Sequence, residues 1–357
     1  MSSPPSGVTV GVDLGGTGTR IVALDRDGAV EYQLSSPTPA GSAGALSGLV
    51  SSIAAAGAGR ELRGVGIGAS GPVDPRGIIR NTETLPAFSD IQITPVISER
   101  LGVPCVIDND AIAAAVGEYA CGAGRGSAGL PVITLGTGVG VAALAGGCPF
   151  RGADGGHPEA GHIPVGGPSA PCYCGLPSCW EQLASRTALD RLAGNQTEAL
   201  AAKARGGDVS AAQVFGTYGE RVGTGLITLL AIFRPDRVVI AGGAARFLDL
   251  FSDGLRHSLD RGPKYTPKPA LLAAELGNLS GAIGAAVLAR EEAAPLADVK
   301  PGQREGDLPV VTRSGSRRPP MGRGTPGPPS QPHPRALCSA VSACGIWPVR
   351  LPDLDAY

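Results

Sequence analysis

Apolar residues near the start of the chain form two short runs separated by a polar, glycine-rich stretch. Residues 8–12 (VTVGV) and 21–24 (IVAL) are predicted as strands, because short apolar runs between turn-forming residues are typical of buried strands. The intervening DLGGTGTR (13–20) predicts a tight strand-to-strand connection. Asp27-Gly28 predicts the next hairpin turn.

The same pattern returns farther along the chain. Residues 130–147 contain an apolar run, a Gly-Thr-Gly turn at 136–138, a second apolar run and a Gly-Gly turn. A strand–turn–strand unit therefore occurs twice, which predicts two similar lobes. Residues 236–243 (DRVVIAGG) predict another buried strand that ends in a glycine turn before a helix.

Helical patterns alternate with these strands. Residues 104–110 (PCVIDND) predict a strand running into a turn, and the alanine-rich 111–120 predicts a helix for which Asn109 or Asp110 is a natural N-cap. Four more segments have helical patterns: 181–194, 211–233, 245–260 and 280–292. Strands and helices are mixed throughout, so the predicted class is α/β.

Composition narrows the possible partners and location. The chain has 357 residues, 43% of them hydrophobic, enough for a core divided between two lobes. With a net charge of −1 and 17% charged residues, no basic field favours nucleic acid or a membrane surface. The longest apolar runs are shorter than the roughly 20 residues of a spanning helix, and no secretory signal pattern opens the sequence. We therefore expect a soluble cytoplasmic protein without nucleic-acid or membrane partners.

The patterns also suggest domain boundaries. We expect a disordered N-terminus at 1–7, an N-terminal lobe at 8–117 completed by the helix at 280–292, and a C-terminal lobe at 118–279. From Pro295 onward proline is frequent and apolar periodicity is absent, so 295–357 is predicted to be a disordered tail. A proline-rich docking segment, or an extension without a role, is the alternative.

The glycine-rich turns are candidate phosphate-binding sites. Backbone N–H groups of such a turn can converge on phosphate oxygens, and glycine leaves room for the anion. Asp13, at the end of a strand, could orient a hydrated Mg²⁺, and Thr17 and Thr137 could add hydroxyl donors. Neither a Walker P-loop nor a GxGxxG motif opening a helix is present. The alternative is that these turns are simply tight hairpins.

One short segment concentrates metal-binding residue types. Of eight cysteines, three (Cys172, Cys174 and Cys179) lie within eighteen residues of sequence that begin at His162. Structural zinc accepts a Cys₃His set, although the C-x-C pair is narrower than the usual spacing. A disulfide is the alternative, and it would leave one thiol unpaired and His162 without a role.

Five motifs together resemble the ROK family of sugar kinases and repressors: DLGGTGTR, VIDNDA, LGTGVGV, PEAGH and CYCGLPSCWE, in this order between about residues 8 and 291. The resemblance implies a two-lobed, actin-like (ribonuclease H-like) fold with nucleotide and sugar in the cleft. It also implies ATP as phosphoryl donor, Mg²⁺, a structural Zn²⁺ and assembly as a homodimer or homotetramer.

The resemblance assigns the catalytic base to Asp110. Phosphoryl transfer to a sugar needs a carboxylate that accepts the hydroxyl proton, and we expect the following helix N-terminus to keep Asp110 ionised. Asp108 is the rival base but fits the motif poorly, and from local sequence alone Asp110 or Asn109 could be no more than a helix cap.

The resemblance implies the sugar contacts and the zinc ligands, and the glycine turns themselves predict the phosphate and Mg²⁺ contacts. Sugar contacts are assigned to Asn109, Asp110, Glu159, His162 and Glu181. Phosphate and Mg²⁺ contacts are assigned to Asp13, Gly15, Gly16, Thr17, Thr137, Gly138, Gly242 and Gly243. Zinc ligands are His162, Cys172, Cys174 and Cys179. Read alone, Glu181 would be a solvated carboxylate at a helix start, and His157 a solvated loop residue.

The leading functional hypothesis is an ATP-dependent kinase that phosphorylates the 6-hydroxyl of glucose or a closely related hexose or amino-hexose. An amino-sugar kinase, acting on 3-amino-3-deoxyglucose or N-acetylmannosamine, is the alternative, because residues 81–88 (NTETLPAF) replace a Trp-bearing segment common in glucokinases. A sugar-responsive repressor is disfavoured because the first strand begins at Val8, which leaves no room for a helix-turn-helix. A catalytically silent sugar-binding protein is the third possibility.

Overall fold

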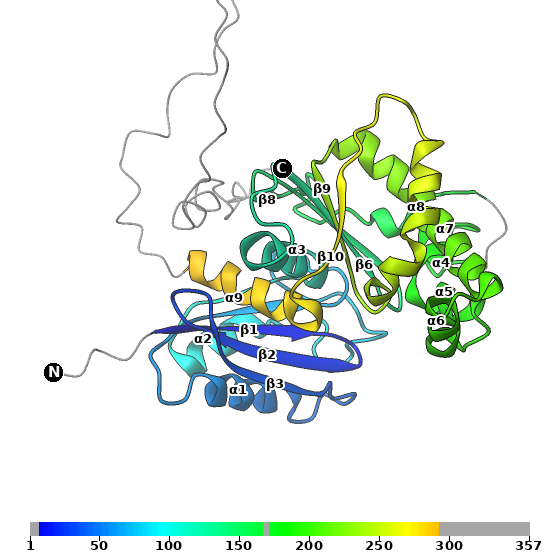
Figure 1. Ribbon diagram of the computed structural model, residues 1–357. Coiled ribbons are helices and arrows are strands. Elements are labelled where there is room, and N and C mark those ends of the chain that lie inside the picture. Colours follow the sequence, from blue (N-terminus) through cyan, green and yellow to red (C-terminus); the bar gives the residue numbers. More distant parts are fainter. Residues whose placement is uncertain (1–6, 167–170, 293–357) are drawn as a thin grey trace, which may run out of the picture.

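The computed structural model describes residues 7–166 and 171–292, so the predicted tail at 295–357 and nearly all of the predicted N-terminal segment 1–7 lie outside the described residues. The described chain is built on two five-stranded sheets with helices packed against both (Figure 1). The two-sheet α/β architecture confirms the predicted fold class.

The first sheet has the strand order β3-β2-β1-β4-β5. Its strands are β1 (Val8–Leu14), β2 (Gly18–Leu24), β3 (Val30–Pro37), β4 (Leu62–Ala69) and β5 (Cys105–Asn109). The first three strands form an antiparallel meander, whereas β4 and β5 run parallel to β1. One face packs on α1 (Ala45–Ala56) and α2 (Ile93–Leu101) through a continuous apolar cluster.

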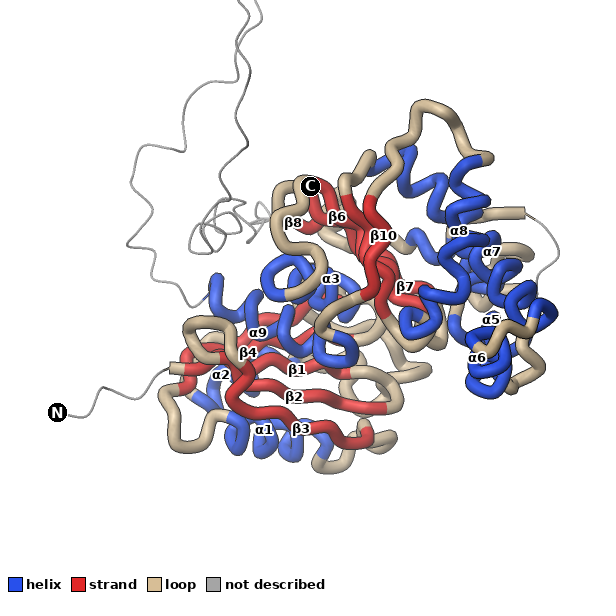
Figure 2. Tube along the Cα trace, viewed as in Figure 1, coloured by secondary structure: helices blue, strands red, loops and turns tan. Residues whose placement is uncertain are grey.

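The second sheet has the order β10-β9-β6-β7-β8. Its strands are β6 (Gly129–Leu135), β7 (Val139–Ala145), β8 (Cys148–Pro149), β9 (Arg237–Ala241) and β10 (Ala270–Ala273). The helices around it are α4 (Trp180–Ala184), α5 (Arg186–Leu192), α6 (Thr197–Arg205), α7 (Val209–Phe233) and α8 (Leu248–Asp260), with short 3₁₀ turns η1 (Ala160–His162), η2 (Ala245–Phe247) and η3 (Gly277–Leu279). Figure 2 shows these helices gathered on one side of the second sheet.

The predicted duplication is visible in the strand pairing. The first strand of each unit, β1 or β6, forms an antiparallel hairpin with the next strand through a glycine turn. Each of these first strands also pairs in parallel with a later strand, β4 or β9. The sheets are therefore two copies of one plan, although the lobe boundary expected at 117/118 stays a prediction.

Two helices rich in small residues lie between the sheets. Helix α3 (Asp110–Cys121) follows β5 and packs on β6 and β7, whereas α9 (Ser280–Glu292) packs on β1 and β4 (Figure 1). They cross closely: a Cβ added at Gly284 would lie 1.6 Å from the Ala113 carbonyl oxygen, and one added at Gly117 would lie 2.3 Å from that of Ser280. Only glycine permits this approach.

A buried carboxylate fixes this crossing. Glu118 is fully buried in α3, and its two oxygens accept four hydrogen bonds. The donors are Ala123 N (3.0 Å), Glu275 N (3.1 Å), Leu276 N (3.1 Å) and Ser280 Oγ (2.7 Å). Two segments supply these donors: the one that follows α3 and the one that leads into α9. Glu118 therefore links the C-terminal end of α3 to the N-terminal end of α9.

The expectation of a single helix over 181–194 is wrong, because this segment forms two helices, α4 and α5. Ser185 has an extended backbone (φ −64°, ψ 162°), which ends α4. Its hydroxyl accepts a hydrogen bond from Ala188 N and thereby caps α5.

Among the described residues, no helix combines the length and the apolar character needed to cross a bilayer.

Candidate active site

Asp110 and Asn109 lie where β5 gives way to α3. The Asn109 side-chain oxygen accepts hydrogen bonds from Ala111 N (2.8 Å) and Ile112 N (3.3 Å), and its amide donates to the Gly71 carbonyl (3.1 Å). Asn109 is therefore the helix cap, and Asp110 is the first residue of α3. This leaves Asp110, which is partly exposed, as the acid whose position is not explained by capping alone.

The rival acid, Asp108, has a cationic partner. Arg151 forms a two-pronged ion pair with it, through Nη1–Oδ1 at 3.3 Å and a second contact between Nη2 and Oδ2. Asp108 Oδ1 also accepts a hydrogen bond from the backbone N–H of Asn109 at 2.7 Å. Both oxygens of Asp108 are therefore occupied by Arg151, and one of them also by the backbone, so the geometry favours Asp110 over Asp108 as a base.

The environment of Asp110 suits proton transfer near neutral pH. Burial and the neighbouring Asp13 carboxylate raise its pKa to about 7, although hydrogen bonds from Ala111 N and Ser70 act in the opposite direction. Desolvation and like-charge repulsion thus act against the expectation that the helix terminus keeps Asp110 ionised. A base with a pKa near the working pH is efficient in general base catalysis.

Asp13 lies at the carboxyl end of β1, two strands from Asp110. Its oxygen is 3.1 Å from Arg20 Nη1 on the neighbouring strand β2, and burial raises its pKa while Arg20 offsets part of that rise. Gly68 on the intervening strand β4 lies opposite both Asp13 and Asp108. A Cβ at Gly68 would meet Ala113 Cβ at 2.7 Å and Asp110 Cα at 3.5 Å, so this glycine keeps the space between the two strand ends small and free of side chains.

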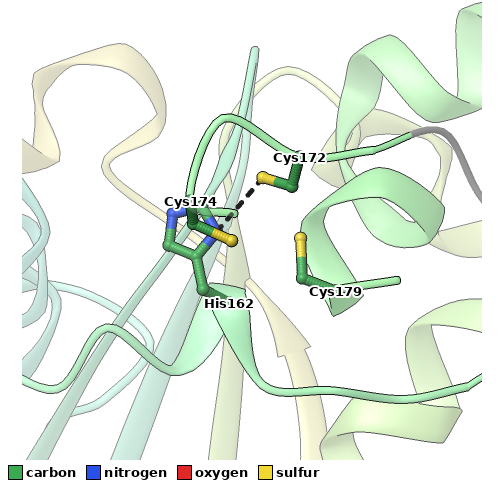
Figure 3. Close-up of side chains that lie close together, drawn as sticks. All are labelled: His162, Cys172, Cys174 and Cys179. Atoms are coloured by element: carbon green, nitrogen blue, oxygen red, sulfur yellow. Dashed lines mark hydrogen bonds between the residues drawn. The ribbon is translucent and has the colours of Figure 1, made fainter. Parts of the chain in front are cut away.

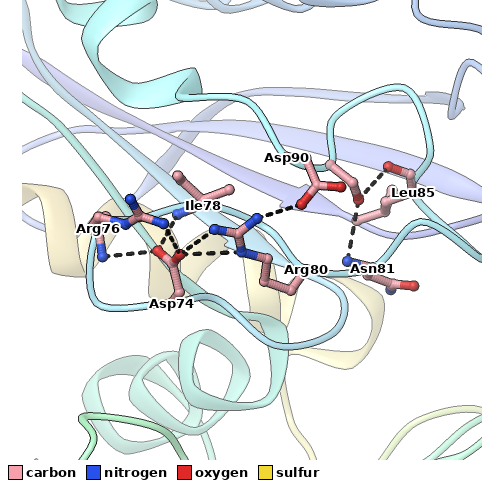
Figure 4. A network of polar contacts seen from close by, with 8 residues as sticks. Asp74, Arg76, Ile78, Arg80, Asn81, Leu85 and Asp90 are labelled. Carbon is pink, nitrogen blue, oxygen red and sulfur yellow. Dashed lines mark hydrogen bonds and ion pairs between the residues drawn. The ribbon is translucent and has the colours of Figure 1, made fainter.

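The loop after β4 borders the first glycine turn. A Cβ added at Gly16 would lie 2.8 Å from Thr84 Cβ, so the segment 81–88 packs directly on the predicted phosphate turn. Asn81 anchors this segment by donating to the Ser70 carbonyl (3.0 Å) and to Thr84 Oγ1 (2.6 Å). The rest of the loop is held by a charged network centred on Arg80 (Figure 4).

In that network Arg80 bridges two aspartates. Its guanidinium donates to Asp74 Oδ2 (2.9 Å) and Asp90 Oδ1 (2.6 Å). Asp74 in turn accepts the backbone amides of Arg76 (2.9 Å) and Ile78 (3.0 Å), which closes a turn within the loop (Figure 4). These contacts stabilise the conformation of residues 74–90, which lie beside the glycine turn at residues 15–17.

The glycine turns of the second sheet are joined by a residue that the sequence analysis missed. Arg186 N donates to the Gly136 carbonyl (2.8 Å), and its guanidinium donates to the Gly243 carbonyl (3.3 Å). Thr187 Oγ1 donates to the Thr137 carbonyl (3.0 Å). Gly242 has a left-handed backbone (φ 80°) and packs on Leu135. The predicted phosphate residues Thr137, Gly138, Gly242 and Gly243 therefore form one assembly, while Gly15, Gly16 and Thr17 belong to the other sheet.

The four predicted zinc ligands lie together, as Figure 3 shows. The nitrogen of His162 and the sulfurs of Cys172, Cys174 and Cys179 lie within 4.8 Å of one another. A tetrahedral zinc site requires ligand atoms about 3.5–3.8 Å apart, so the cluster fits Zn²⁺ with small adjustments. Backbone pairing of Pro164 with Cys179 closes the loop and brings the histidine to the cysteines.

The orientation of His162 is consistent with this fit. Its Nδ1 faces the Cys172 sulfur at 3.6 Å, and its Nε2 shares a hydrogen bond with the exposed Tyr173 hydroxyl at 3.0 Å. The two ring nitrogens thus have separate surroundings, one thiol-lined and one open to a hydroxyl. Tyr173 therefore contacts the ring nitrogen of His162 that does not face the cysteines, which is the nitrogen left for the predicted sugar contact.

Glu181 connects the cysteine cluster to the second glycine turn. It is buried rather than solvated, which contradicts the simple reading of a helix-start carboxylate. One oxygen accepts the Val139 amide (3.1 Å), and the other lies 3.8 Å from the Cys172 sulfur. A Cβ at Gly138 would come within 2.3 Å of the Glu181 carboxylate, so this glycine leaves the space that Glu181 occupies.

Glu159 is exposed and close to His157. The two side chains are 3.4 Å apart, and the His157 ring is only 11% exposed, so the expectation of a solvated loop histidine is wrong. Its burial follows from contacts that spacing cannot reveal, because Arg151 and Asp108 lie near enough to influence its titration. A cavity of about 250 Å³ is lined by Phe150 after β8, by Phe233 at the end of α7 and by residues of β6 and β7, and none of the predicted site residues lines it.

Comparison with known proteins identifies relatives that match nearly the whole described chain. The model of the ROK family matches residues 9–292. Glucokinase from Streptomyces coelicolor is 34% identical over 314 residues, covering 80% of this chain and 98% of the relative. The crystal structure of a ROK family glucokinase from Streptomyces griseus in complex with glucose and AMPPNP is similar with a TM-score of 0.69 and 33% identity over 80% of this chain and 99% of that one. ROK hexokinase from Thermus thermophilus gives a TM-score of 0.68 and 32% identity, with 80% and 98% coverage. The chain therefore belongs to the ROK family.

Proposed function

We propose that this protein is an ATP-dependent hexose kinase that phosphorylates the 6-hydroxyl of glucose or a closely related hexose. The observation that carries the proposal is the placement of Asp110 at the start of α3, with its pKa raised to about 7 by burial and by Asp13. Support also comes from the similarity to glucokinase along nearly the full length of that relative.

In the proposed reaction Asp110 accepts the proton of the sugar 6-hydroxyl. As that proton leaves, the hydroxyl oxygen forms a bond to the terminal phosphorus of ATP, and the bond from that phosphorus to the bridging oxygen breaks, releasing ADP. Because such a transition state needs little covalent help, the contribution of the protein is positioning and charge stabilisation. Asp110 then returns its proton to solvent.

The glycine turns would hold the nucleotide. Backbone amides around Gly15, Gly16 and Gly138 are suited to phosphate oxygens, and the hydroxyls of Thr17 and Thr137 are exposed beside them. Gly242 and Gly243 complete the assembly on the second sheet. Mg²⁺, when bound, would neutralise phosphate charge, and Asp13 would orient its water shell.

The sugar would be held by acids and by the histidine of the cysteine cluster. Glu159 is exposed, and the oxygen that does not face His157 could accept hydroxyl hydrogen bonds. Glu181 and Asn109 would have to share oxygens or amide hydrogens that already contact the backbone. We infer that Zn²⁺ bound by His162 and the three cysteines has a structural role and fixes the orientation of this segment.

The proposal includes a cytoplasmic location. It also includes assembly as a homodimer or homotetramer, which sedimentation velocity of the purified chain would test. The central test is a coupled ADP-release assay with glucose, mannose, fructose, N-acetylmannosamine, N-acetylglucosamine and 3-amino-3-deoxyglucose. We expect turnover with glucose. Preferred turnover of an amino-hexose would move the protein to the amino-sugar alternative, and turnover with none of the six would refute the kinase proposal and favour a silent sugar-binding protein.

A further inference from the structure

The Arg151–Asp108 ion pair connects the two sheets beside the site. Asp108 lies at the carboxyl end of β5 in the first sheet, and Arg151 follows β8 in the second. The Arg151 side chain is 23% exposed and that of Asp108 is 9% exposed. Desolvation of two charges largely cancels their attraction, so a buried pair contributes little net stability and is better explained by the geometry that it enforces.

On the first sheet, the pair controls the backbone that carries the base. Asp108 Oδ1 accepts the Asn109 amide (2.7 Å) while it receives Arg151 Nη1 (3.3 Å). Asp110 is the next residue but one. Any displacement of the Asp108 carboxylate is therefore transmitted to the strand end from which Asp110 projects.

On the second sheet, Arg151 organises the segment that leads to the predicted sugar contacts. Its Nη1 donates to the Gly155 carbonyl (3.2 Å), and Gly152 N donates to the Gly156 carbonyl (2.8 Å), so residues 151–156 form a compact loop around the guanidinium. His157 and Glu159 follow directly, with their side chains 3.4 Å apart. The η1 turn, which ends at His162, begins one residue later.

We propose that Arg151 and Asp108 are positioning residues that set the separation between Asp110 and the sugar-binding segment 157–162. This inference rests on the proposed function, because it concerns the sugar substrate of the same site. A general base must lie within about 2.6–3.2 Å of the hydroxyl that it deprotonates. An error of about 1 Å in such a geometry can cost roughly 100-fold in rate.

The test is steady-state kinetics of Arg151→Met and Asp108→Asn with glucose and ATP as varied substrates. We expect KM for glucose to rise about 10-fold or more and kcat to fall. KM for ATP should change by less than about 2-fold, because the hydrogen bonds of the pair among the described residues go to residues outside the glycine turns. Arg151→Lys should recover only part of the activity, because an ammonium cannot form the two-pronged contact. The double variant should be no worse than either single variant, since both remove the same interaction.

The matched control is Arg205→Met, which removes another two-pronged arginine–aspartate pair, with Asp249, away from the site. Its kinetics should equal those of the wild type. Glucose titration by calorimetry and thermal unfolding of each variant separate loss of sugar affinity from loss of folding. Wild-type kinetics for Arg151→Met, an equal rise in both KM values, or a lower Tm with unchanged kinetics would each overturn the inference. An inactive wild-type protein would instead refute the proposed function.

Discussion

Replacing Asp110 by Asn should make the protein inactive and more stable at the same time. Asparagine keeps an oxygen that can accept the Ala111 amide, which Asp110 Oδ1 now accepts at 2.8 Å, so the start of α3 is preserved. It removes a negative charge that burial and Asp13 make unfavourable. Loss of a general base typically lowers turnover by a factor of about 100 or more, whereas ATP and sugar affinities should change little.

The stabilisation can be estimated from the pKa. A rise from 3.8 to about 7 corresponds to about 4 kcal/mol when the group is fully ionised. Asp110 is partly exposed, so water screens part of this cost, and we expect about 1–2 kcal/mol and a rise in Tm of a few degrees near pH 8. Because the folded-state pKa is the higher one, the wild type gains stability from this group as the pH falls from about 7 towards 4, and the variant should lack that gain.

Thermal unfolding at pH 5 and pH 8, together with the pH profile of kcat/KM, tests both parts. Wild-type kcat/KM should fall about tenfold per pH unit below about pH 7, as the base becomes protonated. Asp236→Asn is the matched control of opposite sign, because Ser127, Ala128 and Gly129 donate to that carboxylate and lower its pKa. It should lower Tm and leave activity intact. An Asp110→Asn protein that keeps near-normal turnover, or that is no more stable than the wild type at pH 8, would refute the assignment.

Three further predictions concern the contacts around the site. Removal of zinc with a chelator should weaken glucose binding at least tenfold while AMPPNP binding persists, and calorimetry with both ligands checks it; full glucose affinity in metal-free protein would contradict a structural role for zinc. Gly138→Ala should lower kcat/KM about tenfold or more, because the new methyl group would lie 2.3 Å from the Glu181 carboxylate; Gly216→Ala, at a position with open space, is the control. Glu118→Gln should lower the free energy of unfolding in urea by about 2–4 kcal/mol, since an amide cannot accept from all four donors; a change below about 0.5 kcal/mol would show that the crossing does not depend on the charge.

The sequence contains strong local signals for the fold because its defining units are local. Each strand–turn–strand unit occupies fewer than twenty consecutive residues, and the glycine turn that identifies it also sets its hairpin register. The predicted runs at 8–12 and 21–24 are longer in the structure, at 8–14 and 18–24, because a short turn at residues 15–17 lets pairing extend to Leu14 and Thr19. The helix at 111–120 was equally visible from its cap and alanine content.

The electrostatics of the site could not be predicted in the same way. The pKa of Asp110 depends on Asp13, 97 residues away in the chain, and the partner of Asp108 is 43 residues away. Glu118 looks like an ordinary helical glutamate within an alanine-rich run, and nothing in its neighbours indicates four donors. For Arg151 the only available signal was an arginine in the glycine-rich approach to Glu159, which spacing alone does not distinguish from a solvated residue.

The two copies of the duplicated unit carry different chemistry, and this difference explains why contacts between the sheets matter. Two residues before the first glycine of each turn stands Asp13 in one copy and Thr134 in the other. Asp13 and Asp110, the carboxylates of the proposed mechanism, lie at the ends of strands of the first sheet, whereas the cysteine cluster and Glu159 belong to the second. Neither sheet holds a complete site. In the mechanism that we propose, phosphoryl transfer then depends on the relative placement of the sheets. Glu118 stabilises this placement near the C-terminal end of α3, and we propose that the Arg151–Asp108 pair does so at the N-terminal end.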